Sequence, residues 1–271
     1  MHNVDEEKLM EQEQRLKEKM VKVKRIFVVM SGKGGVGKTT VAVNLAYALA
    51  SADKQTVIFD VDIHGPNIAK MLGIEGERLI DAGCGVEPVP VITNLSAVTL
   101  ACTGHDDSTP FIWRGPMKSA VIRQLLSDVN WGELDYLIID APPGTGDEHL
   151  SVCQMIPNIS GAIIVATPQD VAVMDARKSI KFAQELKIPI VGIIENMSGF
   201  TCPHCNKKVD IFKRGGAQAL ARELNVPFLG RVPFEPEFVG FGDKGTPFVS
   251  FNERSESAAA FMEIVKKIEE F

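Results

Sequence analysis

The feature that most constrains the fold of this chain is a glycine-rich segment at residues 31–40, SGKGGVGKTT. It follows an apolar run at residues 25–30 and precedes residues 39–50, whose apolar positions repeat with helical periodicity. Glycines let consecutive backbone N–H groups turn inward around phosphate oxygens, and the helix that follows directs its positive end at the same anions. The order of strand, glycine loop and helix therefore predicts a phosphate-binding P-loop.

The residue types in this loop suit a nucleoside triphosphate with magnesium. The pattern G-x-x-x-x-G-K-T runs from Gly32 to Thr39. Lys38 is expected to neutralise the β and γ phosphates, and the Thr39 hydroxyl is expected to ligate Mg²⁺. The nucleotide-binding residues predicted from the loop are Gly32, Lys33, Gly34, Gly35, Val36, Gly37, Lys38, Thr39 and Thr40.

Further apolar runs along the chain predict the remaining strands of a sheet. They lie at residues 56–60, 136–140, 162–166, 190–194 and 228–232, with helix-like stretches between most of them. Near-continuous apolar strands alternating with helices predict an α/β fold: a doubly wound, mostly parallel sheet with helices on both faces. Residues 86–100, where Val, Pro and Ile alternate, predict either an inserted pair of strands or an extended loop.

The first 24 residues differ in composition from the rest of the chain. Glu and Lys dominate them, and Leu9, Leu16 and Val23 recur at intervals of seven. This pattern predicts a charged, mostly exposed helical arm. Residues 25–271 are expected to form a single ATPase domain, because doubly wound folds of this size keep one continuous core.

Charge and cysteine usage restrict the partners and the compartment. A net charge of -6 and a pI near 5.5 argue against the broad electropositive face that nucleic acids or anionic membranes require, so neither partner is expected. No apolar run is long enough to cross a bilayer, and the charged N-terminus does not resemble a secretory signal. Five cysteines spread over the chain indicate reduced thiols, which predicts a cytoplasmic protein.

Two acidic positions follow predicted strands, at the sheet edge where ligands bind. Asp140 ends the run at residues 136–140, where a carboxylate can hold Mg²⁺ through water. Asp62 follows the run at residues 56–60, together with Asp60. Because positioning, Mg²⁺ and cations account for phosphoryl transfer, these residues predict slow, magnesium-dependent hydrolysis of ATP to ADP and phosphate. A buried or capping aspartate is the alternative for each position.

A second candidate site is the pair Cys202 and Cys205, a C-x-x-C in a loop after a core strand. Two thiolates at this spacing grip a metal centre from one side, whereas tetrahedral zinc and iron–sulfur clusters take four ligands. No second close pair exists in the chain, so two subunits could supply the four sulfurs, which predicts a homodimer. His204 between the cysteines is expected to be a bystander. Cys84 is expected in a loop, and Cys102 and Cys153 in the core.

Three alternatives to a bridging cluster remain for this pair: half of a structural zinc site, a redox-active dithiol, or two loop cysteines without a ligand. Zinc is the main rival. The redox pair is the least favoured, because residues 206–208 do not resemble the helix start that lowers the pKa of a thioredoxin-like thiol.

Five segments together resemble one known family. They read GKGGVGKTT at 32–40, DVDIHGPN at 60–67, WRGPMKSA at 113–120, WGELDYLIIDAPPGTGDEHL at 131–150 and ENMSGFTCPHC at 195–205. Over roughly residues 24–270 the chain resembles the Mrp/ApbC family of deviant Walker A ATPases, relatives of the MinD/ParA class. The resemblance implies ATP, Mg²⁺ and a 4Fe–4S cluster at a homodimer interface, with zinc in aerobic preparations. Apo iron–sulfur proteins would then be the acceptors of the cluster.

The resemblance also implies roles for single residues. Lys33 resembles a lysine that reaches across a dimer to the partner's nucleotide, and Asp62 resembles the residue that orients the attacking water. With Lys38, these are the expected catalytic residues. Gly144 resembles a switch glycine whose N–H senses the γ phosphate, and Asn196 would hydrogen-bond adenine. A solvated loop lysine and a turn asparagine are the alternatives for Lys33 and Asn196.

The sequence departs from the family pattern in two places, and other functions use the same loop. Asn206 stands where glycine commonly follows the second cysteine, and Glu235 stands where aspartate is usual near adenine. One alternative is a MinD/ParA-like spatial-organisation ATPase, but residues 258–271 mix two lysines with three glutamates and predict an ordinary terminal helix. The other is a regulatory ATPase with a structural zinc at the dimer interface.

Overall fold

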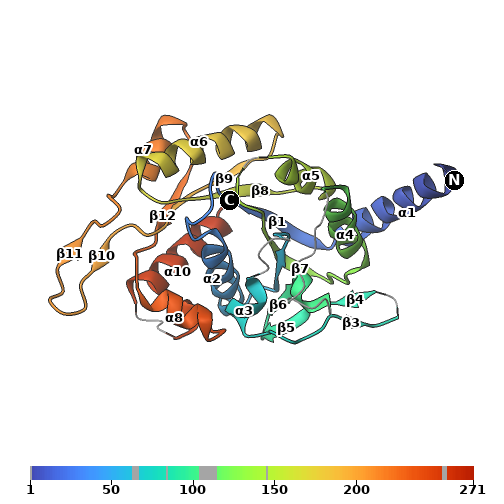
Figure 1. Ribbon diagram of the computed structural model, residues 1–271, viewed down its shortest axis with the longest axis horizontal. Coiled ribbons are helices and arrows are strands. Elements are labelled where there is room, and N and C mark those ends of the chain that lie inside the picture. The colour runs from blue at the N-terminus through green and yellow to red at the C-terminus, as the bar shows by residue number, and fades with distance from the viewer. Residues whose placement is uncertain (1, 63–66, 84, 104–114, 145, 252–254) are drawn as a thin grey trace.

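The computed structural model describes residues 2–62, 67–83, 85–103, 115–144, 146–251 and 255–271 (Figure 1). Its centre is an eight-stranded sheet in the order β12-β9-β8-β1-β7-β2-β6-β5. Every neighbouring pair is parallel except β5 and β6, so the predicted doubly wound, mostly parallel sheet is confirmed. The strands are β1 (Val23–Met30), β2 (Thr56–Asp60), β5 (Val89–Ile92), β6 (Leu95–Val98), β7 (Leu134–Asp140), β8 (Gly161–Ala166), β9 (Ile190–Glu195) and β12 (Phe228–Arg231).

Helices cover both faces of this sheet, because side chains alternate along each strand. In β1, Phe27 and Val29 belong to one buried cluster, and Val28 and Met30 belong to the other. The first cluster includes residues of α2 (Lys38–Ser51), α3 (Ile68–Leu72), α9 (Phe248–Phe251) and α10 (Glu256–Glu269). The second includes residues of α1 (His2–Met20), α4 (Gly115–Asp128), α5 (Asp147–Met155), α6 (Asp170–Glu185) and α7 (Gly216–Glu223).

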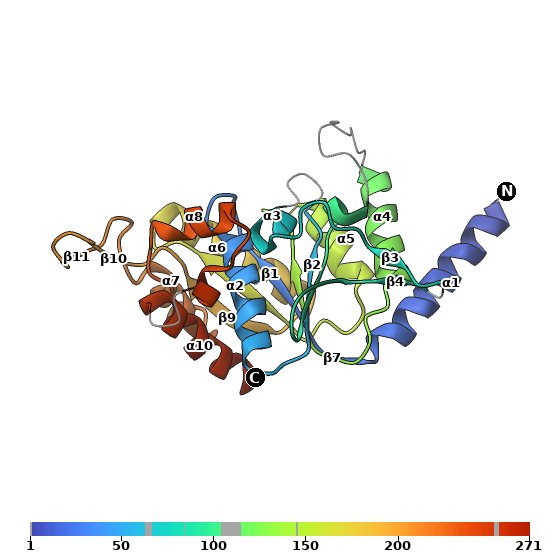
Figure 2. The ribbon, with the colours of Figure 1, turned by 90° about the horizontal axis from the view of Figure 1, so that it is seen from below.

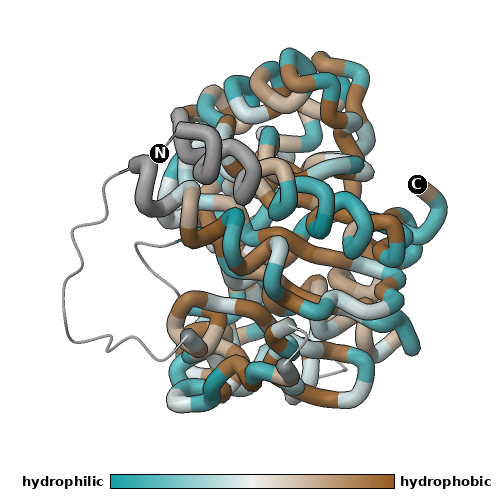
Figure 3. The backbone as a smooth tube through the Cα atoms, turned by 90° about the vertical axis from the view of Figure 1, so that its right-hand side faces the viewer, coloured by the Kyte–Doolittle hydropathy of each residue, from teal (hydrophilic) through white to brown (hydrophobic). Residues whose placement is uncertain are grey.

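The outer helices also have one apolar and one polar face. Figure 3 shows hydrophilic and hydrophobic residues alternating along the outer helices, as expected for helices with one buried face. The terminal helix α10 buries Phe261, Ile264 and Ile268, so it packs as the ordinary terminal helix that the sequence predicts. None of the helices in the described part of the chain combines the length and the apolar character that crossing a membrane requires.

The predicted N-terminal arm is helix α1, and it is tied down at its C-terminal end. Its described side chains are mostly exposed, but Leu16 and Met20 are buried against α4. Lys19 Nζ donates to the Ser127 carbonyl at 2.7 Å, which fixes the same end. The third member of the heptad pattern, Val23, begins strand β1, so the sheet starts before the boundary expected at residue 25. The division into an arm and one domain stays a prediction.

Residues 86–100 form a pair of strands rather than an extended loop. β5 and β6 are antiparallel, and β6 extends the sheet by pairing with β2 in parallel. Two short ribbons lie outside the sheet: β3 (Ile80–Asp81) with β4 (Val86–Glu87), and β10 (Phe200–Thr201) with β11 (Lys208–Val209). Cys84 lies outside the described residues. Cys102 and Cys153 are buried as expected, and burial raises the pKa of Cys153 to about 11.

Candidate functional site

The P-loop connects β1 to α2 as the sequence predicts, and its backbone demands glycine. Gly35 and Gly37 have φ angles of 78° and 79°, in the left-handed region that favours glycine. At Gly37 a Cβ would also lie 2.3 Å from the Asn196 side-chain nitrogen. Asn196 therefore packs directly on the loop, and its Nδ2 donates to the Val36 carbonyl at 2.9 Å.

A buried ion pair closes the floor of this loop. Lys38 Nζ lies 2.5 Å from Asp140 Oδ1, and the Thr39 hydroxyl donates to Asp140 Oδ2 at 2.7 Å. Burial raises the pKa of Asp140, while the Lys38 charge opposes that shift. Strand β7 thus brings its terminal carboxylate to the first residues of α2, which the expected role of Asp140 requires.

Asp60 has a structural position beside this pair. It is the partner of Asp140 in the register of β2 with β7. Burial, and then the Asp140 charge, raise the pKa of Asp60 well above its usual range. One of its oxygens accepts the Asp62 backbone N–H at 3.0 Å. Asp60 therefore fixes the backbone of Asp62, whose own half-buried side chain lines the phosphate cavity described next.

Most of the predicted phosphate-binding residues line one cavity of about 210 Å³, but Gly32 and Val36 do not. The cavity lies over the P-loop, and its lining includes Lys33, Lys38, Thr39, Asp62 and Pro143. Gly144 follows Pro143, with a φ of 103°, and its N–H donates to the Ser31 carbonyl at 3.0 Å. The Gly144 N–H, which the family resemblance expects to sense the γ phosphate, thus contacts the first residue of the P-loop.

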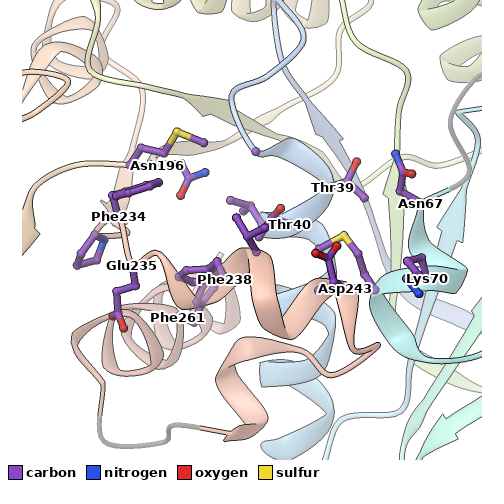
Figure 4. A pocket seen from close by; sticks show the side chains of 17 residues that line it. Thr39, Thr40, Asn67, Lys70, Asn196, Phe234, Glu235, Phe238, Asp243 and Phe261 are labelled. Carbon is purple, nitrogen blue, oxygen red and sulfur yellow. The ribbon is translucent and has the colours of Figure 1, made fainter. Parts of the chain in front are cut away.

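A larger cavity of about 350 Å³ continues from the phosphate cavity, sharing Gly37, Thr39 and Thr40 with it. We call this larger cavity the base pocket, because it adjoins the phosphate cavity where the base of a nucleotide would lie. Figure 4 shows Asn196 and Phe234 on one side of it and Phe238 and Phe261 below it. Its lining is mostly apolar, with a few polar groups, which is typical of a small-molecule site. Together the two cavities have the composition that a nucleotide needs: a cationic, amide-lined end and an aromatic end.

Several residues of the base pocket were not predicted as ligand-binding residues. Phe234 precedes α8 (Glu237–Asp243), which contributes Phe238, and α3 contributes Lys70. The aromatic spacing in residues 233–238, PFEPEF, is the signal that could have indicated them. Glu235 also lines the pocket, but its carboxylate accepts the backbone N–H of Ser257 at 3.0 Å at the start of α10.

The cysteine pair lies apart from both cavities, on the ribbon formed by β10 and β11. Figures 1 and 2 both show this ribbon projecting from the body at the end opposite α1. Cys202 is half-buried and Cys205 is exposed. The turn between them and β11 closes when Asn206 N–H donates to the Cys202 carbonyl at 2.8 Å. Asn206 has a φ of 55°, so it supplies the left-handed conformation that glycine would otherwise provide.

The environment of Cys202 favours a thiolate. The backbone N–H groups of His204 and Cys205, and the Cys205 thiol, donate to its sulfur and lower the pKa of Cys202. Within the described ranges, no group of three or more His, Cys, Asp or Glu side chains is placed to hold a metal ion. The ribbon brings Cys202 and Cys205 close together, and their role as metal ligands stays a prediction.

Comparison with known proteins assigns the chain to a family. Residues 22–269 match the ParA family model described as NUBPL iron-transfer P-loop NTPase. The chain belongs to this iron-transfer P-loop NTPase family. Its resemblance to iron–sulfur cluster carriers of the Mrp/ApbC type is thereby confirmed, and the glycine loop at residues 31–40 is that of a P-loop NTPase.

Similarity to individual proteins supports the assignment of the chain to this family. It is 52% identical over 262 residues to the iron–sulfur cluster carrier protein of Methanocaldococcus jannaschii, covering 97% of this chain and 90% of the relative. A nucleotide-binding protein of Archaeoglobus fulgidus, solved with ADP and with cobalt detected, is 35% identical with a TM-score of 0.77, covering 86% of this chain and 91% of that one. The cell division ATPase MinD of Pyrococcus furiosus, at 22% identity and a TM-score of 0.68 over 91% of this chain and 99% of that one, shares the fold.

Proposed function

We propose that this protein is an ATP-dependent iron–sulfur cluster carrier of the cytoplasm. Two copies would hold one 4Fe–4S cluster through Cys202 and Cys205 and pass it to apo iron–sulfur proteins. The observation that carries the proposal is the presence of a nucleotide site and a projecting two-thiol ribbon in one chain of an iron-transfer family. The similarity to the iron–sulfur cluster carrier protein of M. jannaschii supports it.

In this proposal the P-loop binds ATP with Mg²⁺. The Thr39 hydroxyl and the Asp140 carboxylate lie 2.7 Å apart, and paired oxygen donors are what Mg²⁺ prefers. Bound there, the ion would neutralise charge on the phosphates. Lys38 would exchange its contact with Asp140 for the phosphates, and the Gly144 N–H would leave the Ser31 carbonyl for the γ phosphate.

The remaining site residues would act on hydrolysis and on the base. Asp62, held by Asp60, would orient the attacking water, and Lys33 would reach the nucleotide of the second subunit. Asn196 uses its amide nitrogen on Val36, so its carbonyl oxygen is the atom suited to accept the adenine amino group. Hydrolysis to ADP and phosphate would be slow, because Lys33 would reach the nucleotide only in the dimer.

The cysteine ribbon would carry the cargo. Each subunit supplies half of a four-sulfur shell, so cluster binding and dimer formation would favour each other. The lowered pKa of Cys202 supports this role, since the thiolate is the form that binds metal.

Anaerobic reconstitution with iron and sulfide tests the proposal. Wild type is expected to turn brown, to dimerise and to contain about four iron and four sulfide per dimer. Cys202→Ala and Cys205→Ala should lose the cluster but keep ATP binding, whereas Cys153→Ala, at a buried thiol, should load normally. Normal loading of the two loop variants, or a colourless wild-type monomer, would reject cluster carriage. Stoichiometric zinc that iron does not displace would favour a structural zinc site.

Transfer is the second part of the test. Reconstituted protein is mixed with an apo-ferredoxin-type acceptor, and the acceptor's spectrum is followed with and without ATP. Lys38→Ala is expected to load its cluster but to lose the effect of ATP on transfer.

A further inference from the structure

The cysteine ribbon grows directly out of the wall of the base pocket. Asn196 and Met197 line that pocket, and β10 begins three residues after Met197, at Phe200, and leads into Cys202. The intervening segment is anchored: Ser198 N–H donates to the Val232 carbonyl at 2.9 Å, and the Ser198 hydroxyl donates to Glu195 at 2.6 Å. These hydrogen bonds attach the start of the ribbon to the sheet at Ser198.

Phe234 is the residue that the pocket and the ribbon share. On one side it lines the base pocket. On the other, its ring centroid lies 6.1 Å from that of Phe200 on β10 and 6.0 Å from that of Phe212, just after β11. Its backbone N–H also donates to the Gly199 carbonyl at 2.8 Å. One aromatic ring thus lies beside Phe200 on β10 and beside Phe212, three residues after the end of β11.

A further cavity shows that this contact region is not fully filled. About 230 Å³ of space lies behind Phe234, and its lining includes Thr201 and Pro203, which flank Cys202. Phe234, with its neighbours Pro233 and Glu235, lines both this cavity and the base pocket. A ligand packed against Phe234 in the base pocket therefore touches a segment that also borders the cysteine turn.

We propose that Phe234 is a positioning residue that couples base occupancy to the geometry of Cys202 and Cys205. This proposal rests on the proposed function. In it, Phe234 is the contact through which nucleotide and metal affect each other. A base packed against the ring would hold Phe200 and Phe212, and hence the ribbon, in the arrangement that brings both thiolates to one metal centre. Linkage is reciprocal, so metal on the cysteines would raise nucleotide affinity by the same factor.

The test measures that factor with Co²⁺ and ADP on the reduced full-length protein. Thiolate-to-cobalt absorbance gives the Kd for Co²⁺ with and without ADP and Mg²⁺. Wild type is expected to show a ratio of the two Kd values between about 5 and 150. Phe212→Leu removes a ring contact from the ribbon side without touching the base pocket, so it should bring the ratio close to one. Its separate affinities for ADP and for Co²⁺ should stay within about threefold of wild type.

Two further variants make the test specific. Phe234→Leu removes the shared ring itself and should also bring the ratio close to one, and its ADP affinity is measured separately. Phe182→Leu makes the same change on α6, where the ring packs against His149 away from both sites, and should keep the wild-type ratio.

The outcomes separate this inference from the proposed function. A wild-type ratio near one, or an unchanged ratio in Phe212→Leu and Phe234→Leu, would overturn the coupling role and leave cluster carriage standing. Unchanged Co²⁺ absorbance in Cys202→Ala would instead remove the metal site on which both depend.

Discussion

Lys38 and Asp140 form a buried ion pair, with the ammonium 2.5 Å from the carboxylate. The pair keeps both charges compensated while they are out of water. Under the proposed function, the phosphates of a nucleotide would compete with Asp140 for Lys38, and a metal ion would compete with Lys38 for Asp140.

Removal of Lys38 should affect both binding and stability. Lys38→Ala leaves the Asp140 carboxylate buried without its cation, which costs about 3–5 kcal/mol before the carboxyl takes up a proton. We expect a lower melting temperature and loss of ATP binding, measured by calorimetry. Lys24→Ala removes an exposed lysine that pairs with Asp135, and it should change neither quantity appreciably. Equal effects of the two substitutions would contradict the role given to the buried pair.

Glu195 should make stability depend on pH in the acid range. Burial acts to raise its pKa, but hydrogen bonds from Ser198, Gly215 and Ala217, with the charge of Arg231, outweigh it, so the net shift is downward. The folded state then holds fewer protons than the unfolded state, so the stabilisation is full above the ordinary glutamate pKa. It is lost as pH falls through the lower, folded value.

Glu195→Gln should remove that acid-sensitive part of the free energy of unfolding and cost about 2 kcal/mol at neutral pH. Urea unfolding at a series of pH values measures both effects. Glu223→Gln is the matched control, because Glu223 also pairs with an arginine, Arg177, but on the surface. A pH dependence that survives in Glu195→Gln would show that another group is responsible.

The close approach of Asn196 to the P-loop predicts an uneven response to alanine at two glycines. Gly37 and Gly76 both have positive φ angles, but only at Gly37 would the new Cβ meet a neighbour, the Asn196 amide. Gly76→Ala should cost about 1 kcal/mol from backbone strain. Gly37→Ala should cost more and weaken ADP binding, and Asn196→Ala combined with it should restore part of the stability. Thermal unfolding of wild type, Gly76→Ala, Gly37→Ala and the double variant measures these differences in stability.

The thiols should differ in reactivity in the order of their exposure and pKa. Cys202 and Cys205 should be alkylated by iodoacetamide before the buried Cys102 and Cys153, as followed by peptide mass spectrometry. The midpoint of the Cys202 rate against pH should lie below the ordinary thiol value, because its thiolate accepts three hydrogen bonds. Bound Co²⁺ should protect this pair. Faster labelling of Cys153 would contradict the burial described above.

Much of the architecture follows from local patterns in the sequence. The run at residues 56–60 is strand β2 with the same limits, and residues 39–50 are helix α2 with one residue added at each end, because apolar periodicity is set by burial on each face. The arm was harder to place. Leu16 and Met20 are buried only because α4 lies against them, and no local pattern contains that contact.

The nucleotide site was partly predictable for the same reason. Lys33, Lys38, Thr39 and Asp62 belong to motifs or follow strands, and the structure brings them to one cavity. Phe234 was not assigned, since its role depends on contacts with Phe200 and Phe212 that tertiary packing creates. The hydrogen bond from Asn196 Nδ2 to the Val36 carbonyl could not be predicted either, because the two residues are distant in sequence.

The outlying position of the β10–β11 ribbon separates two kinds of access. The two cavities lie at the carboxyl edge of the sheet, whereas Cys202 and Cys205 belong to the ribbon that projects beyond it (Figure 2). Under the proposed function, an acceptor protein could therefore reach a metal centre on the ribbon without contacting either cavity.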